Sequence, residues 1–298
     1  MRYYRVMEKF GETHLCVEAA DGVLTSLTSI NDLVKEFRNL LEASHITETS
    51  VDAIAERILQ NGSGKEFNLD NLIDWSLSNS GEARIIKPLE PDEMWAGGFG
   101  NMILTPEKLA SSDDSDQLAY NTPEISTVIY KGTNQRLVGP FDTIGIRADT
   151  ERTIAEGEVV FVIYKGMLAG YTTGNEVAGN LSALSPRWSV PAKVFKGCAS
   201  VGPCIATPES IENPMSMQLD LIHYRGNEIV AEDSSPAIFK RSPEEIVAST
   251  VAHDSPPDLV IQYSGGFAGV ADALLKAGDV VRITLEGIGF VENTVEVV

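Results

Sequence analysis

Histidine, cysteine and basic residues are scarce in this sequence of 298 residues, and each shortage excludes a class of site. The four histidines are scattered and none falls in an HxH or HExxH pattern, so we expect no histidine-based zinc site or catalytic triad. The three cysteines are an odd number without CxxC spacing, which indicates neither a disulfide framework nor a zinc site. Acidic residues number 43 against 23 basic ones. The resulting formal charge of −20 repels phosphate backbones, so we expect no nucleic-acid partner.

Long hydrophobic runs are also missing. No stretch approaches the ~20 apolar residues that a membrane-spanning helix needs, and the N-terminus lacks a signal-peptide pattern. We therefore expect a cytoplasmic protein without a membrane partner. Hydrophobic residues still make up 43% of the chain, which is enough to build the core of one large domain or two smaller ones.

The N-terminal part, residues 1–85, is predicted to be a small α+β domain without chemistry of its own. A weakly alternating first segment that contains an Asp21-Gly22 turn predicts a hairpin. Three stretches then carry apolar residues at helical spacing. They predict helices over residues 29–43, 50–60 and 69–77.

The most informative stretch is an apolar run at residues 159–164 that ends in a Lys165-Gly166 dipeptide. Six β-branched, aromatic or aliphatic residues between glycines predict a buried strand. Lys-Gly predicts a tight hairpin turn after it, because glycine accepts a positive φ. A regular antiparallel hairpin about this turn would place Glu156 opposite Asn175.

Three glutamates are expected to meet at the open end of this hairpin. Glu156 and Glu158 are two residues apart on one strand, so their side chains leave the same face, and Glu176 arrives from the returning strand. Like charges this close are costly unless they are protonated or bridged by a cation. An all-oxygen cluster suits Mg²⁺, Mn²⁺ or Ca²⁺ better than zinc. On the residues alone, solvated carboxylates at the mouth of a strand are the alternative.

Further motifs surround the hairpin. Gly-Tyr-Thr-x-Gly-Asn and an acid follow the turn, and residues 191–203 read Pro-Ala-Lys-Val-Phe-Lys-Gly-Cys-Ala-x-x-Gly-Pro. Segments at 130–133, 144–149 and 275–281 agree with the same pattern. Together these motifs resemble the fumarylacetoacetate hydrolase superfamily, and most of all its branch of 2-keto-3-deoxy-sugar-acid dehydratases. The similarity covers about residues 88–298.

The resemblance implies an α+β, mainly β fold. A mixed β-roll core over residues 86–298 would follow the small N-terminal region, in a homodimer or homotetramer. In this superfamily a divalent ion held by acidic side chains binds the carboxylate and keto oxygen of a 2-keto acid and stabilises an enolate. The implied activity is that of a lyase that dehydrates a 2-keto-3-deoxy sugar acid, with Mg²⁺, or else Mn²⁺ or Ca²⁺, as cofactor.

The resemblance also assigns residues. Glu156, Glu158 and Glu176 match the metal-ligand positions, and Lys193 matches a catalytic lysine that holds the substrate's oxygens. Glu176 stands where relatives usually carry aspartate, so its carboxylate lies one methylene further out. Gly157 replaces a common proline, which implies a less rigid strand entry.

Two positions compete for the general base. Dehydratases of this branch carry the base in an Arg-Pro-Glu-x-Phe-x-Lys segment, and here three extra residues separate Pro-Glu from the lysine. Alignment on Pro-Glu assigns Glu124, whereas alignment on Lys131 assigns Thr127, a poor base because a hydroxyl needs a partner. Related proteins contact the substrate carboxylate through a Thr-Gly-Thr-like element, which implies this role for Ser264 and the backbone of Gly265.

Two other functions stay open. An acylpyruvate-type hydrolase would use the same metal to cleave a carbon–carbon bond, but the histidine-bearing segment of those hydrolases is not matched between Trp95 and Pro106. The departures around the site also allow a non-catalytic relative that binds a keto acid, because fold does not determine function. Elimination is the reaction that we expect.

Overall fold

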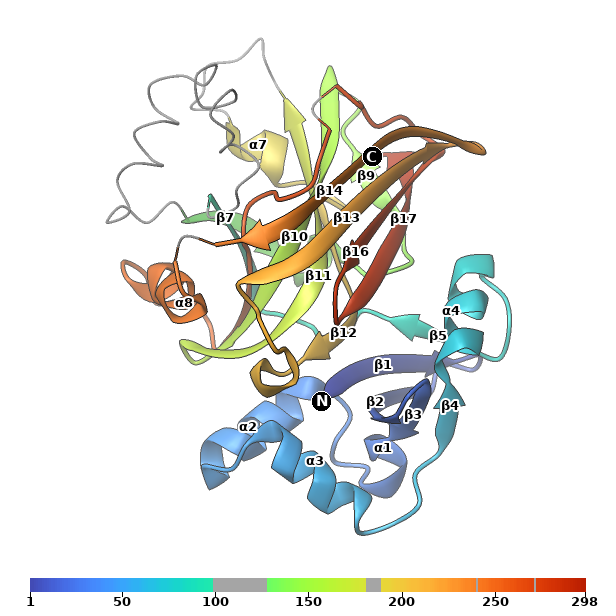
Figure 1. Ribbon diagram of the computed structural model, residues 1–298, viewed down its shortest axis with the longest axis vertical. Helices are drawn as coiled ribbons and strands as arrows, with labels where there is room; N and C mark the ends of the chain where they lie inside the picture. Colours follow the sequence, from blue (N-terminus) through green and yellow to red (C-terminus); the bar gives the residue numbers. More distant parts are fainter. Residues whose placement is uncertain (99–127, 181–188, 240, 271) are drawn as a thin grey trace.

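The computed structural model describes residues 1–98, 128–180, 189–239, 241–270 and 272–298, and two β-sheets form its centre (Figure 1). The larger sheet has twelve strands and the smaller one has five. The larger sheet runs β4 (Glu66–Asn68), β3 (Val23–Ser26), β2 (Thr13–Ala20), β1 (Arg2–Glu8), β12 (Ala199–Ala206), β11 (Met167–Asn180), β10 (Arg152–Tyr164), β15 (Leu259–Tyr263), β6 (Glu93–Gly97) and β7 (Val128–Thr133). Two short strands, β5 (Ala83–Ile86) and β8 (Leu137–Val138), pair with β1 and β12.

The smaller sheet packs on β10, β11 and β12 of the larger one. Its order is β14 (Glu228–Ile238), β13 (Ser216–Arg225), β16 (Asp279–Leu285), β17 (Gly289–Val297) and β9 (Ile144–Ile146). The helices are α1 (Leu27–Ile30), α2 (Phe37–Thr47), α3 (Val51–Leu59), α4 (Leu69–Ser78), α7 (Ser189–Lys193) and α8 (Pro243–Val251), with 3-10 turns η1 (Asn134–Arg136) and η3 (Pro208–Ser210). Parallel and antiparallel pairs occur in both sheets, which confirms the predicted mixed, mainly β fold.

The N-terminal elements lie at one end of the molecule, in blue in Figure 1, and join the core through β1. This strand pairs with β2 on one side and with β12 on the other, where Tyr3 lies opposite Ile205. The sheet is therefore continuous from the N-terminal region into the core. A domain boundary near residue 85 stays a prediction.

The first predicted helix begins later than the apolar spacing indicated. Residues 29–43 were expected to be helical, but α2 begins at Phe37 after a break that leaves Leu33 78% exposed. Local hydrogen bonds explain the break, because the Thr28 hydroxyl donates to the Val34 carbonyl at 2.7 Å. Glu36 then starts α2 with a capping box. The other two predicted helices match α3 and α4.

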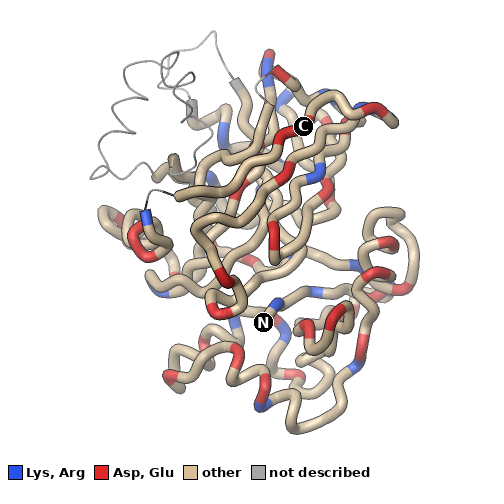
Figure 2. Tube along the Cα trace, in the orientation of Figure 1, with Lys and Arg blue, Asp and Glu red and all other residues tan. Residues whose placement is uncertain are grey.

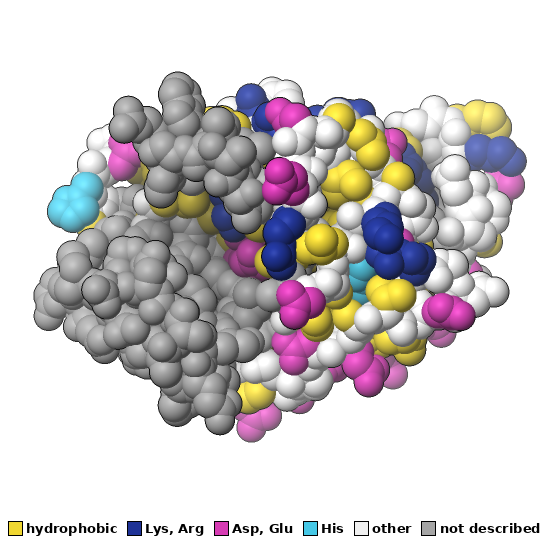
Figure 3. All heavy atoms as spheres, turned by 90° about the horizontal axis from the view of Figure 1, so that it is seen from above, with side chains coloured by type: hydrophobic (Ala, Val, Ile, Leu, Met, Phe, Trp, Pro, Cys, Tyr) yellow, Lys and Arg dark blue, Asp and Glu magenta, His cyan; other side chains and the backbone are white. Residues whose placement is uncertain are grey.

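The surface charge is dispersed. Asp and Glu are spread over the N-terminal elements and the core in Figure 2. On the face shown in Figure 3, basic and acidic side chains are interspersed with hydrophobic ones. Among the described residues, no helix is both long and apolar enough to cross a membrane.

The central hairpin forms as predicted, but with a bulge. Ile163 on β10 pairs with Leu168 on β11, whereas the preceding residue, Val162, pairs with Gly170. Ala169 is therefore an extra residue on the returning strand, which is the defining feature of a β-bulge. The apolar and small side chains of this stretch fit a regular strand equally well, so nothing in the pattern indicated the bulge.

Because of the bulge, the predicted pairing of the two strands is wrong by one residue. Beyond it Glu156 lies opposite Glu176, not opposite Asn175. A shift of one residue turns each side chain to the other face of a strand. Without the extra residue, Glu176 would therefore point away from Glu156, so the bulge is what brings the third carboxylate to the site.

Gly174 lies directly opposite Glu158 in the central hairpin, where the packing leaves no room for a side chain. A Cβ atom at Gly174 would lie 2.3 Å from Val160 Cγ2 and 2.7 Å from Tyr263 Cε1. We expect Gly174→Ala to lower the free energy of unfolding by about 1–3 kcal/mol, as overpacking of a dense core does. Urea denaturation measures the loss. Gly62→Ala is the control, because its Cβ would meet Ile30 Cγ2 at an ordinary 3.4 Å; equal midpoints for both variants would contradict the prediction.

Candidate metal centre

Three carboxylates meet on one face of the central hairpin. β10 carries Glu156 and Glu158, and β11 places Glu176 opposite Glu156. One carboxylate oxygen from each glutamate lies within 4.8 Å of the other two. Glu158 is fully buried and Glu176 is 3% exposed, so these are not the solvated carboxylates of the alternative interpretation. An all-oxygen donor set of this kind fits a hard divalent ion.

Two lysines complete the cluster. Lys131 on β7 is fully buried, and its Nζ lies 2.9 Å from Glu176 Oε1 while it donates to the Val177 carbonyl at 3.0 Å. Lys193 ends α7, and its Nζ lies 3.1 Å from Glu176 Oε2 and 3.7 Å from Glu156 Oε1. The Lys193 side chain is 26% exposed, so it lies at the accessible side of the cluster.

Lys131 was missed as a site residue by sequence reasoning. It served only as an alignment anchor in the Tyr130-Lys131-Gly132-Thr133 motif. Lysines are almost never fully buried unless they are paired. Its position inside a short strand could have indicated that it is buried. Its partner, Glu176, is far away in the sequence, and only the fold brings the two together.

Glu158 is held by a backbone group. The Gly265 amide donates to Glu158 Oε2 at 2.7 Å. The other oxygen, Oε1, is buried and has no hydrogen-bond partner among the described residues. A buried carboxylate oxygen without a partner is costly. An ion placed between the three glutamates would satisfy it, so these residues fit a divalent metal.

The charges of the cluster act on one another. Burial and the neighbouring Glu176 and Glu156 raise the pKa of Glu158 well above its usual range. Burial also raises the pKa of Glu156, although Lys193 opposes this shift. Burial disfavours the ionised form of Glu176 too, but Lys131 and Lys193 outweigh it and lower the pKa of that carboxyl. The two lysines therefore favour the ionised form of Glu176, whereas the pKa values of Glu156 and Glu158 stay raised. A bound cation would favour the ionised form of these two carboxylates as well.

The remaining predicted site residues are placed as follows. Ser264 is buried, and its hydroxyl donates to the Gly265 carbonyl at 3.1 Å. The Gly265 amide is used by Glu158. Contact of these two residues with a substrate stays a prediction. Glu124 and Thr127 lie outside the described residues.

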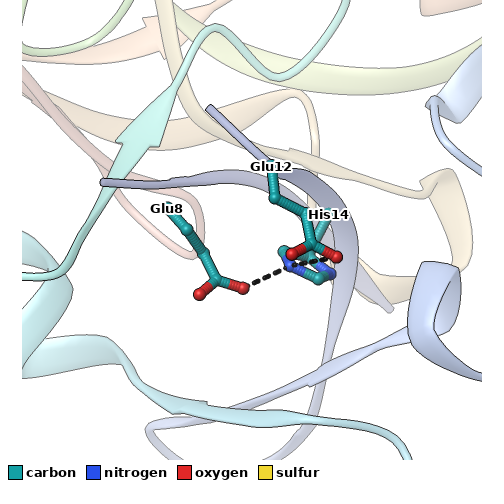
Figure 4. A group of neighbouring side chains, drawn as sticks. All are labelled: Glu8, Glu12 and His14. Carbon is teal, nitrogen blue, oxygen red and sulfur yellow. Dashed lines mark hydrogen bonds and ion pairs between the residues drawn. The ribbon is translucent and has the colours of Figure 1, made fainter. Parts of the chain in front are cut away.

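A second group, Glu8, Glu12 and His14, also comes within 4.8 Å (Figure 4). His14 Nε2 lies 2.6 Å from Glu8 Oε1, and His14 Nδ1 lies 3.0 Å from the Ser26 hydroxyl. Lys65 Nζ lies 2.6 Å from the same Glu8 oxygen, and this ammonium group lowers the pKa of Glu8. Because a lysine already neutralises Glu8, we interpret this group as a structural ion pair.

The family model described as "Fumarylacetoacetate (FAA) hydrolase C-terminal" matches residues 104–296. The chain belongs to the fumarylacetoacetate hydrolase family. The resemblance drawn from the motifs is thereby confirmed, and the match includes the three glutamates and both lysines. Residues 1–103 precede the matched segment.

This member of the fumarylacetoacetate hydrolase family is similar to two named dehydratases. It is 29% identical over 303 residues to the "Probable 2-keto-3-deoxyxylonate dehydratase" of Haloferax volcanii, which covers 99% of this chain and 100% of that protein. It is also 29% identical over 218 residues to the "2-dehydro-3-deoxy-D-arabinonate dehydratase" of Saccharolobus solfataricus, covering 70% of this chain and 73% of that protein.

Solved structures show the same fold. The apo form of 2-keto-3-deoxy-D-arabinonate dehydratase superposes with a TM-score of 0.80 at 24% identity, covering 100% of this chain and 99% of that chain. The structure of that enzyme "complexed with magnesium and 2,5-dioxopentanoate" gives a TM-score of 0.80 at 23% identity over the same shares.

Proposed function

We propose that the chain is a divalent-metal-dependent lyase that dehydrates a 2-keto-3-deoxy sugar acid. The charge balance of the site carries the proposal, because three carboxylates face two ammonium groups. With all three carboxylates ionised the site has an excess of one negative charge, and a divalent cation, which favours that ionised form, turns it into an excess of one positive charge. The carboxylate of a 2-keto acid would neutralise that charge. The dehydratase names of the relatives, and the magnesium and 2,5-dioxopentanoate of one solved neighbour, support the same reaction.

Each charged residue then has a role. Glu156, Glu158 and Glu176 would hold Mg²⁺, with Mn²⁺ or Ca²⁺ as substitutes. When bound, the ion supplies Lewis-acid stabilisation of negative charge on a substrate oxygen. Lys131 fixes the position of Glu176 from inside the sheet. Lys193, the more exposed lysine, is placed to donate hydrogen bonds to an anionic oxygen of the substrate.

Elimination of water also needs a base that removes a proton next to the keto group. Glu124 is our candidate, with Thr127 as the alternative position. We also propose that the chain works in the cytoplasm. The family resemblance implies that it forms a homodimer or homotetramer.

Calorimetric titration with Mg²⁺ and Mn²⁺, with and without oxalate, tests the metal site. We expect metal binding that oxalate tightens, because its two carboxylates mimic the chelating oxygens of an enolised 2-keto acid. An absence of binding at millimolar metal would overturn the enzymatic proposal and favour a non-catalytic role.

The reaction is tested separately with a 2-keto-3-deoxy pentonate. Dehydration releases water and a 2-keto acid with a terminal aldehyde, which a carbonyl reagent and mass spectrometry identify. An acylpyruvate is offered as a second substrate, and its cleavage by water to pyruvate and a carboxylic acid, without turnover of the pentonate, would favour the hydrolase.

A further inference from the structure

Residues 264–269 follow β15 and lie along the strand that carries the metal-binding glutamates. The Ser264 amide donates to the Val159 carbonyl at 3.1 Å, and the Phe267 amide donates to the Gly157 carbonyl at 3.0 Å. In return, the Gly157 amide donates to the Ala268 carbonyl at 2.7 Å. Between these bonds the Gly265 amide reaches Glu158 Oε2. The segment is therefore fixed to β10 on both sides of its contact with Glu158.

Gly157 makes this close packing possible. A Cβ atom at Gly157 would lie 2.6 Å from Leu219 Cδ2 and 3.2 Å from Ile283 Cγ2 on the smaller sheet. Its backbone forms an isolated bridge with Ala268. The absence of a side chain lets the smaller sheet approach the strand between the two glutamates, next to the segment that holds Glu158.

The outer end of the segment is held from the smaller sheet. The Gly269 amide donates to Asp233 Oδ2 at 3.0 Å, and the neighbouring Ser234 amide donates to Asp233 Oδ1 at 2.9 Å. Asp233 lies on β14 opposite Leu221, which is 2% exposed, and paired residues project from the same face of a sheet. Its carboxylate thus occupies the inward face of β14, where burial is costly without a hydrogen-bond partner.

An inward charge on an edge strand has a competing explanation. β14 is the edge of the smaller sheet, and natural sheets use inward-pointing charges at edges to prevent association with other chains. That role needs only a charge. It does not need the specific contact with Gly269, which is four residues from the amide that holds Glu158.

We propose that Asp233 is a positioning residue for the metal-binding carboxylate of Glu158, acting through residues 264–269. The inference rests on the proposed metal site. Asp233 anchors Gly269, the bonds to Gly157 and Val159 fix the segment to β10, and the Gly265 amide then holds the Glu158 carboxylate beside the other two glutamates. Groups that orient metal ligands are a recurring determinant of metal affinity.

The test compares Mn²⁺ affinity by calorimetry in Asp233→Ala, Asp233→Ser and Asp233→Asn. Direct partners of metal ligands are worth about 10–100-fold in affinity, and Asp233 acts one step further out, so we expect about 3–10-fold weaker binding for Ala and Ser. Neither side chain reaches Gly269. Asn should lose less affinity than Ala and Ser, because its amide oxygen accepts the Gly269 N–H while its NH2 group replaces only the oxygen that accepts from Ser234. If the alanine variant does not fold, the serine variant, which also lacks the contact with Gly269, gives the same comparison.

Glu232→Ala is the matched control, since this neighbouring carboxylate is exposed and should leave the affinity unchanged. Equal affinity in all four variants and the wild type would overturn the positioning role. If edge protection is the only role, Ala, Ser and Asn will all increase aggregation in light scattering without altering affinity. A wild type that binds no metal would instead overturn the proposed metal site, so the two failures are distinguishable.

Discussion

Glu158→Gln is expected to abolish measurable Mg²⁺ binding and at the same time to raise the thermal midpoint of the metal-free protein. The substitution keeps the shape of the side chain and its bond from the Gly265 amide. It removes a fully buried carboxylate that faces two others and whose Oε1 has no partner among the described residues. Loss of that charge removes a ligand for the ion, but it also removes a desolvation cost and a like-charge repulsion.

Loss of Mg²⁺ binding together with a higher thermal midpoint would show that the charge of Glu158 serves metal binding and not stability. A gain of about 1 kcal/mol corresponds to about 2–4 °C in a domain of this size, which differential scanning fluorimetry resolves. Excess Mg²⁺ should raise the midpoint of the wild type and leave the variant unmoved. Glu66→Gln, which neutralises an exposed glutamate on β4, serves as the control and should change neither quantity. A lower midpoint for metal-free Glu158→Gln would show that the carboxylate is structural.

The sequence located the site because its chemistry is local. Glu156 and Glu158 share a face through strand periodicity alone, and the Lys165-Gly166 turn determines where the strand returns. The exact partner of Glu156 was not predictable, because the bulge at Ala169 leaves no signature in a run of apolar and small residues. β11 has a second irregularity against β12, so its register depends on strands that lie far apart in the sequence.

Two further charged residues at or near the site could not be predicted, because their positions depend on pairing between strands that lie far apart in the sequence. The motifs indicated Lys193, but Lys131 and the contact of Asp233 with Gly269 depend on how β7 and β14 are placed relative to the central hairpin. The misplaced start of α2 has a local cause instead. There, side-chain hydrogen bonds from polar residues outweighed a helical apolar pattern.

Lys131→Met is expected to cause the largest loss of stability of any substitution at the site. Lys131 is fully buried, and methionine replaces its volume but leaves Glu176 Oε1 without its ammonium partner and the Val177 carbonyl without its donor. Breaking one side of a buried ion pair costs about 3–5 kcal/mol. Lys193 remains beside Glu176, so we expect the lower part of this range in urea denaturation of the metal-free protein.

Lys196→Met is the matched control. Lys196 pairs with Glu296 at 3.2 Å, but its side chain is 76% exposed, and a surface pair of this kind is worth at most about 1 kcal/mol.

The double variant Lys131→Met/Glu176→Gln removes both buried charges and should recover at least half of the stability lost, because no uncompensated carboxylate is left behind. It should still fail to bind Mg²⁺, since Glu176 is a ligand in the proposed site. If Lys131→Met were no more damaging than Lys196→Met, Glu176 would be protonated in the metal-free protein and the assignment of Lys131 as its counter-charge would be wrong. A double variant as unstable as Lys131→Met alone would instead assign the loss to the Val177 carbonyl, and the two measurements together therefore separate the ion pair from the backbone contact.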